Sequence, residues 1–179
     1  NIAWFVLQAA YVPYAMRSLG LDAIGVGVTL ACYGAGMVVG ALFAARVLRA
    51  LPFGCAILVG PYTSVAASLV MAATILWPTG VLAAISFFMF GAGPILWAIT
   101  STTLRQTVTP GAMLGQVSAI FLTVNTGVRP IGAALGGAIG ATYGEQACLI
   151  VAAIGFAVQA SVITWSPVRT LRQLPAAVE

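Results

Sequence analysis

The sequence predicts an all-α integral membrane protein, built as a single bundle of six transmembrane helices. Charged residues make up only 6% of the 179 residues, whereas a soluble domain has about 25%. Apolar residues gather in six successive runs, at residues 2–16, 23–45, 54–77, 80–104, 115–140 and 147–165. Membrane-spanning strands would be ~10 residues long and alternate in polarity, which these runs do not do, so we expect helices.

The lengths of the runs fit the thickness of a bilayer. About 20 apolar residues cross ~30 Å of hydrocarbon, and five of the runs reach about this length. The first run is shorter, and the chain opens on Asn1 rather than on methionine. No basic segment or small-residue cleavage site marks the start as a signal peptide. We therefore expect a chain cut inside its first helix, as part of a longer protein.

Short connectors with turn residues separate the runs. Pro52 and Gly54 lie between the second and third runs, and Pro78 and Gly80 between the third and fourth. Proline and glycine end helices and allow the chain to reverse. No linker is long enough to separate two domains, so residues 1–165 are predicted to form one bundle. Residues 166–179 contain two further prolines and are predicted to be a loose cytoplasmic tail.

The positions of the arginines predict the orientation in the membrane. The seven arginines are distributed over gaps that whole spans separate, so they do not form a nucleic-acid-binding patch. The gaps on one side hold only Arg17, balanced by Asp22 and Glu145. The gaps after the second and fourth runs, together with the tail, hold Arg46, Arg49, Arg105, Arg169 and Arg172. The positive-inside rule therefore places both ends of the chain in the cytoplasm.

Polar, aromatic and small residues inside four of the runs recur at helical spacing, which places them on one face of each helix. These stripes comprise Trp4, Gln8 and Tyr11; Thr29, Tyr33, Gly36 and Gly40; Ser86, Phe90, Gly93, Trp97 and Thr100; and Ser118, Leu122, Asn125, Arg129, Gly132 and Gly136. The third and sixth runs carry less polarity, with Tyr62 and Gln159 as exceptions. We therefore expect four helices to surround a wet cavity and two to face lipid.

Glycine and proline inside the runs allow two interpretations, close packing between helices or freed backbone that lines a cavity. The pairs Gly36 and Gly40, and Gly132 and Gly136, are spaced four apart, which is typical of closely packed membrane helices. Gly93 precedes Pro94, and a proline in the middle of a span kinks the helix and frees a backbone carbonyl. Freed backbone at this depth is tolerated where it is buried in protein or lines a cavity.

Arg129 lies ~20 Å along its predicted helix, between the midplane and the outer third of the hydrocarbon. An arginine facing lipid there costs ~3 kcal/mol or more, so its side chain must face protein or water. Pro130 follows it, and Asn125 lies one turn away. One hypothesis is a structural arginine bonded to helix carbonyls or reaching toward the surface. The other is a site for an anionic substrate group, a counter-charge or a gate.

The absence of histidine excludes histidine-based zinc sites and serine–histidine catalysis. The three cysteines fall inside spans without metal or redox spacing, and no cofactor or metal is predicted. An intramembrane enzyme would need a nucleophile–base pair or an acid in the spans, which the sequence does not offer. A transporter and a self-contained six-helix channel or scaffold remain as alternatives.

Several stretches resemble the major facilitator superfamily, most closely its bacterial efflux-type members. They are Arg105-Gln106 with Pro110, Leu114-Gly115-Gln116-Val117-Ser118-Ala119 and Arg129-Pro130-Ile131-Gly132-Ala133. The stretch from Gly40 to Arg46, with Arg49, is similar to the cytoplasmic loop motif of that family. We expect Arg105, in the next cytoplasmic gap, to belong to the same set of loop residues. The acidic residue of the motif is replaced by alanine, and Gln116 stands where arginine is common.

This resemblance implies helices seven to twelve of a twelve-helix transporter, the C-terminal half, itself a 3+3 inverted repeat working by alternating access. It implies as partners the membrane lipid, a missing N-terminal half and a small-molecule substrate, and as location the bacterial plasma membrane. The expected activity is efflux of an amphipathic organic compound or drug. Its expected pathway residues are Gln8, Tyr11, Tyr33, Trp97, Asn125 and Arg129, from the helices that correspond to seven, eight, ten and eleven.

Overall fold

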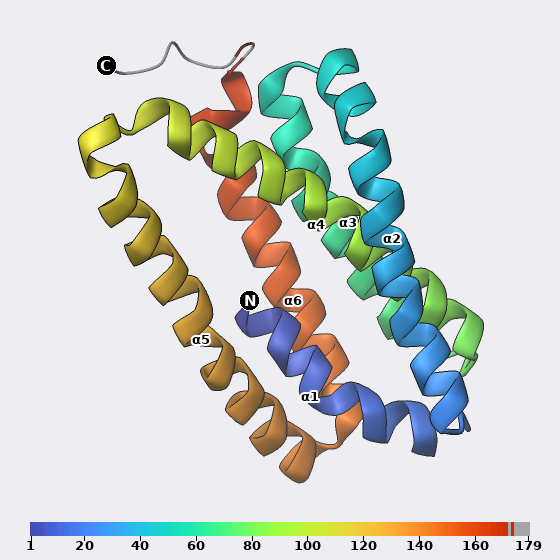
Figure 1. Cartoon of the computed structure of the whole chain (residues 1–179). Coiled ribbons are helices and arrows are strands. Elements are labelled where there is room, and N and C mark those ends of the chain that lie inside the picture. Colours follow the sequence, from blue (N-terminus) through green and yellow to red (C-terminus); the bar gives the residue numbers. More distant parts are fainter. Residues whose placement is uncertain (172, 174–179) are drawn as a thin grey trace.

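The computed structural model describes residues 1–171 and residue 173. These residues form six α-helices and two short 3₁₀ helices, and no strand occurs among them (Figure 1). The helices are α1 (Ile2–Arg17), α2 (Ala23–Ala50), α3 (Phe53–Ala73), α4 (Gly80–Val108), η1 (Gly111–Met113), α5 (Leu114–Tyr143), α6 (Glu145–Trp165) and η2 (Pro167–Thr170). The prediction of an all-helical chain with six helices is confirmed.

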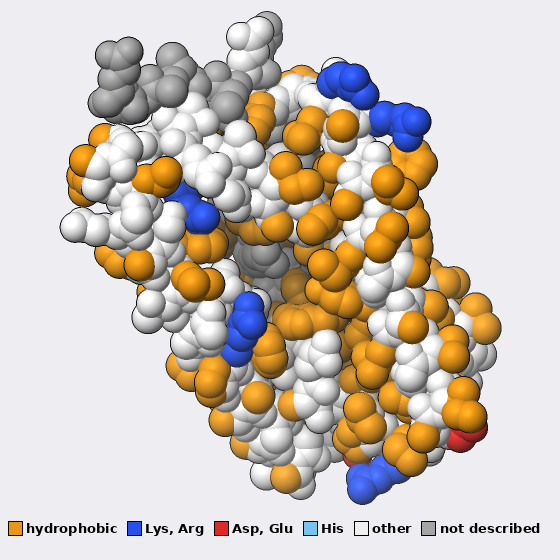
Figure 2. Space-filling model, in the orientation of Figure 1, with side chains coloured by type: hydrophobic (Ala, Val, Ile, Leu, Met, Phe, Trp, Pro, Cys, Tyr) orange, Lys and Arg blue, Asp and Glu red, His pale blue; other side chains and the backbone are white. Residues whose placement is uncertain are grey.

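Five of these helices, α2 to α6, are long and apolar enough to cross a membrane. Large apolar side chains remain exposed along them, among them Ile24, Leu42, Ile120 and Leu122. Figure 2 shows hydrophobic side chains spread over the whole visible face, with few charged ones among them. Lipid or further protein has to cover such a surface, because water would not solvate it favourably. The chain is thus a multi-pass membrane protein.

The helices extend further than predicted at the arginine-rich end. We expected the second and fourth helices to end at residues 45 and 104, but α2 continues to Ala50 and α4 to Val108. Arg46, Arg49 and Arg105 therefore lie in helical turns and not in loops. A cation in the last turn of a helix is favoured by the helix dipole, and Arg49 Nε donates to the carbonyl of Ala45 over 3.1 Å.

The helices pack in the neighbour order α2, α4, α3, α6, α1, α5. The order is symmetric: if α1 is exchanged with α4, α2 with α5 and α3 with α6, the same order results, read in the opposite direction. Figure 1 shows the two flanks of this arrangement, with α2 against α4 on one side and α5 against α1 on the other. The helix pairs of the two flanks therefore occupy equivalent positions in the bundle.

Glycine brings the backbones together on both flanks. A methyl group at Gly36 or Gly40 of α2 would collide with the backbone of Phe88 or Ala92 in α4. On the other flank, a methyl group at Gly132 of α5 would meet the backbone of α1 at Ile2, and one at Gly136 would meet Val6. Small residues at such positions let membrane helices gain dispersion contacts along their backbones.

α1 is tied to its neighbours at the end of the bundle that carries Arg17. The Tyr11 hydroxyl shares a 2.5 Å hydrogen bond with Thr29 of α2, and the Tyr14 hydroxyl a 2.9 Å bond with Thr74 beyond α3. Both tyrosines are fully buried, together with Phe87. One turn further, Arg17 forms a 2.8 Å ion pair with Glu145 of α6. This end of the bundle is therefore a packed core.

The predicted tail is folded where the structure describes it. η2 packs on the start of α3, and the Gly54 amide donates to the carbonyl of Leu171 over 2.7 Å. This bond satisfies one of the free amides that the first turn of a helix leaves. The remaining tail residues, 172 and 174–179, with Arg172 among them, lie outside the described residues.

We expect Gly36→Ala to lower the free energy of unfolding by about 1–3 kcal/mol, because the added methyl group meets the rigid backbone of α4. Gly34→Ala is the matched control on the same helix, since nothing lies within 4 Å of its added methyl group. Gly136→Ala and Gly137→Ala form the equivalent pair on α5. Thermal unfolding of the detergent-solubilised protein measures the difference. Equal midpoints within each pair would mean that the close approach does not stabilise the bundle.

We expect Tyr11→Phe to lower the free energy of unfolding by about 0.6–1.7 kcal/mol, the range for interhelical hydrogen bonds in membrane proteins. The ring would stay in place against Phe87, with ring centroids 4.4 Å apart, so only the hydrogen bond to Thr29 is lost. Tyr143→Phe serves as control, because Tyr143 is exposed and its hydroxyl has no partner among the described residues. An unchanged midpoint for Tyr11→Phe would show that the bond contributes nothing.

Candidate functional site

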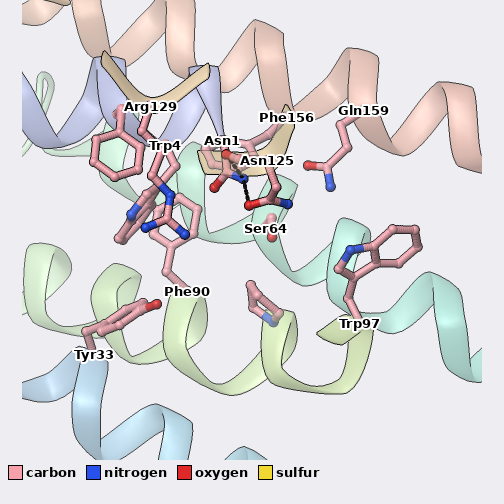
Figure 3. A pocket seen from close by; sticks show the side chains of 12 residues that line it. Asn1, Trp4, Tyr33, Ser64, Phe90, Trp97, Asn125, Arg129, Phe156 and Gln159 are labelled. Atoms are coloured by element: carbon pink, nitrogen blue, oxygen red, sulfur yellow. Dashed lines mark hydrogen bonds between the residues drawn. The ribbon is translucent and has the colours of Figure 1, made fainter. Parts of the chain in front are cut away.

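A cavity of about 450 Å³ lies between the helices, inward from the packed end. Figure 2 shows the visible face hollowed near its centre, and Figure 3 shows the side chains around one cavity from close by. All six helices contribute to the wall. The lining residues are Asn1, Trp4, Phe5, Tyr33, Ser64, Phe90, Pro94, Trp97, Asn125, Arg129, Phe156 and Gln159.

Aromatic rings form one wall of the cavity. The Trp4 indole stacks on Tyr33, with ring centroids 5.3 Å apart and planes 27° apart. The edge of Trp4 meets Phe90 at 5.0 Å, and Phe156 of α6 packs on Phe90 at the same distance. Phe90 and Phe156 are almost fully buried, whereas Trp4 and Tyr33 are only partly buried. The cluster therefore joins the cavity wall to the core.

Amide and hydroxyl groups provide the neutral polar lining. Asn125 of α5 accepts a 2.6 Å hydrogen bond at its side-chain oxygen from the amide of Asn1, so its own NH₂ group remains available as a donor. Gln159 of α6 faces the same space and makes no hydrogen bond within the described chain. Ser64 of α3 donates to the carbonyl of Gly60 over 3.0 Å. The cavity can thus both donate and accept hydrogen bonds.

Among the described residues, Arg129 of α5 is the one charged side chain that lines the cavity, and it is exposed. Its guanidinium carbon lies 5.7 Å from the centre of the Phe5 ring, and Figure 3 shows the guanidinium beside Trp4. Asp22 caps α2, accepting from the Gly25 amide at 2.7 Å, and Glu145 pairs with Arg17. No carboxylate of the described residues therefore neutralises Arg129.

Four of the six expected pathway residues meet in this cavity, namely Tyr33, Trp97, Asn125 and Arg129. Gln8 and Tyr11 are outside it. They share the face of Trp4 but lie one and two turns further along α1, where Gln8 is partly buried and Tyr11 belongs to the packed core. Their helical face was inferred from the spacing, whereas their depth depends on where α2 and α4 close over α1.

The expected kink and packing residues occupy different places. Pro94 lines the cavity, and Gly93 lies against the Thr63 side chain of α3. Pro130 is exposed next to Arg129, and Gly132 and Gly136 contact α1 as described above. Gly40, expected in a cytoplasmic loop motif, lies within α2 against Ala92.

The expectation that the third and sixth helices only face lipid is wrong. α3 contributes Ser64, and α6 contributes Phe156 and Gln159 to the cavity wall. Gln159 in the sequence already indicated that the sixth helix contributes to the cavity, because a lone amide in an apolar span requires a polar environment. Ser64 and Phe156 gave no such indication, since both residue types are common in lipid-facing and in buried helix positions.

Two of the three arginines of the expected loop motif lie over aromatic rings. Arg105 lies 4.1 Å above the Phe121 ring, which links α4 to α5, and Arg46 lies 5.2 Å from the Phe43 ring on its own helix. Among the described residues, no cluster of histidine, cysteine or acidic side chains comes together that could hold a metal ion.

The sequence profile of a transmembrane secretion effector family of the major facilitator superfamily matches residues 6–177. An enterobactin exporter from Citrobacter koseri is 30% identical over 138 residues, covering 77% of this chain and 32% of the exporter. The chain thus spans about a third of the length of that relative. No solved structure gives a significant match. The chain belongs to the transmembrane secretion effector family of the major facilitator superfamily, whose members are transporters and not enzymes.

Proposed function

We propose that the chain is one six-helix half of a twelve-helix secondary transporter that exports a small amphipathic organic compound by alternating access. The observation that carries this proposal is the cavity, which joins an aromatic wall, neutral amides and one arginine inside a membrane bundle. Cavities of ~300–1,000 Å³ with apolar walls and a few polar groups bind drug-sized ligands. The relation to an exporter supports the outward direction.

The symmetric neighbour order supports an inverted 3+3 repeat. Gly36 and Gly40 of α2 have Gly132 and Gly136 of α5 as counterparts, and each pair contacts the backbone of the adjacent central helix. Tyr33 and Arg129 stand at equivalent positions, each three residues before the first glycine of its pair. Both line the cavity. In the proposed transporter the site thus lies on the axis between the two repeats, where such transporters bind substrate.

The outer flanks of the bundle support a missing second half. Within α5, only Gly132 and Gly136 are buried, and apolar side chains such as Leu122, Val124 and Leu135 are exposed. α2 likewise exposes Val38 and Leu42. In the proposal, a second six-helix half covers the side of the bundle between α2 and α5 and closes the cavity, and lipid covers the remaining surface.

The orientation can be tested by labelling introduced cysteines in intact cells of the full-length transporter. We expect Arg49→Cys to react only after the membrane is permeabilised, because the arginine-rich end is proposed to be cytoplasmic. Tyr143→Cys, exposed beside the α5–α6 turn, should react from outside. Both belong in a background without the native cysteines, since Cys55 is exposed and would add signal. The reverse labelling pattern would overturn the proposed orientation.

The role of Arg129 can be tested in the full-length transporter reconstituted in vesicles. If Arg129 binds an anionic substrate group, Arg129→Lys should retain part of the transport rate, because the charge remains. Arg129→Ala should lower transport efficiency about ten- to a hundredfold, the worth of a hydrogen bond to a charged group. Arg17→Ala is the control, since Arg17 is exposed and outside the cavity.

The yield of monodisperse protein is measured in parallel with transport. If Arg129 only holds helix carbonyls, lysine cannot replace its planar fork of donors. Both variants would then lose folded protein together. A falling yield with an unchanged rate per folded molecule would show that Arg129 does not act on the substrate.

A further inference from the structure

We propose that the exported compound is an aromatic organic anion, which binds with its anionic group at Arg129 and its ring on Trp97. This inference rests on the proposed function and adds the chemical class of the substrate and its orientation in the cavity. It follows from the charge of the lining, from the free surface of one indole and from the polar groups between them.

The charge of the lining selects the sign of the ligand. Among the described residues, Arg129 is its one ionic side chain, and the exposed Arg129 side chain lies beside Phe5 and Trp4. Charge–charge attraction strengthens as water is excluded, so an anion gains more once the proposed second half closes the cavity than it would at an open surface. The guanidinium offers paired N–H donors that match a carboxylate or sulfonate. A cation would meet repulsion with no carboxylate in the lining to offset it.

The two tryptophans of the cavity differ in whether a ring face and the indole N–H remain free to contact a ligand. Trp4 is engaged with three rings, stacked on Tyr33 and edge-on to Phe87 and Phe90. Trp97 makes no aromatic pair within the described chain, and its indole N–H has no hydrogen-bond acceptor there. Trp97 therefore keeps both a ring face and a donor for a ligand, whereas Trp4 serves as wall.

Close packing of α4 against α3 positions the Cβ atom of Trp97. A methyl group at Gly60 of α3 would come within 2.5 Å of the Trp97 Cβ atom, so the glycine lets α4 approach α3 closely at this point. The indole projects into the cavity on the side away from Arg129, as Figure 3 shows. The indole thus offers a ring face on which an aromatic ring of a ligand can stack.

Asn125 and Gln159 are drawn between Arg129 and Trp97 in Figure 3. The free NH₂ group of Asn125 and the unpaired amide of Gln159 can bind hydroxyl or carbonyl groups on the body of the ligand. A ligand that reaches from Arg129 to Trp97 thus meets a cation, then neutral donors and acceptors, then an aromatic face. Aromatic acids with polar substituents combine these features in one molecule.

The test measures binding of three probes with the same naphthalene ring and a substituent of similar size to the full-length transporter in lipid nanodiscs, by calorimetry. The probes are 2-naphthoate, the neutral 2-naphthamide and the cationic 2-naphthylmethylammonium. We expect naphthoate to bind at least tenfold more tightly than the amide, and Arg129→Gln to remove this difference. Equal affinities, tighter binding of the cation, or no binding of naphthoate at millimolar concentration would overturn the inference.

The aromatic contact is tested with Trp97→Ala and Trp97→Phe. We expect the alanine variant to weaken naphthoate binding about three- to tenfold, the usual worth of an aromatic pair, and the phenylalanine variant to keep most of the affinity because a ring face remains. Trp165→Ala is the control, since Trp165 is 83% exposed and outside this cavity. If Trp97→Ala binds like Trp165→Ala, the ring does not lie on Trp97.

Efflux from vesicles separates this inference from the proposed function. Export of the amide as fast as naphthoate would leave the transporter proposal standing and refute the preference for anions. Binding with the expected preference but without movement across the membrane would support the site and refute the proposal of transport.

Discussion

The contact between helix backbones at the glycine pairs is the constraint on which the rest of the bundle depends. Gly36 and Gly40 set α2 against α4, and Gly132 and Gly136 set α5 against α1. In hydrocarbon the hydrophobic effect does not drive helices together, so such close contacts must supply dispersion energy instead. They also fix the rotation of α2 and α5 about their axes, which turns Tyr33 and Arg129 toward the cavity.

The two ends of the bundle differ in packing, and this difference locates the cavity. At the end with Arg17, α1 is bonded to α2, to the end of α3 and to α6, and Tyr11, Tyr14 and Phe87 are fully buried. Nearer the middle, the aromatic cluster around Trp4 ends this core and begins the wall of the cavity. A site built on such a packed floor holds its side chains in defined positions.

Electrostatics explains why the cavity is suited to a ligand of one sign. The chain keeps a net formal charge of +4, and its acidic residues Asp22, Glu145 and Glu179 all lie outside the apolar interior of the spans. Arg129 thus carries an exposed positive charge in the cavity lining, within a span, without an acidic partner among the described residues. Such a charge is costly in a membrane unless it faces water or an opposite charge. In the proposed transporter the substrate supplies that opposite charge.

The sequence by itself determined the class of structure. Each span must satisfy its own backbone hydrogen bonds in lipid, so the apolar runs alone predict the number of helices and their approximate limits. Helical spacing likewise identified the face of Arg129, Asn125, Tyr33 and Trp97, because the angle around a helix axis follows from residue number alone.

Only the tertiary structure decided the depth at which each face is covered. Tyr11 shares the face of Trp4 but is buried against Phe87, because α2 and α4 close over α1 at that level. Ser64 and Phe156 joined the site because the crossing of α3 and α6 brings them beneath it. The docking of η2 on Gly54 likewise depends on a backbone bond between distant segments. Contacts of this kind depend on how helices cross, which the periodicity of a single helix does not contain.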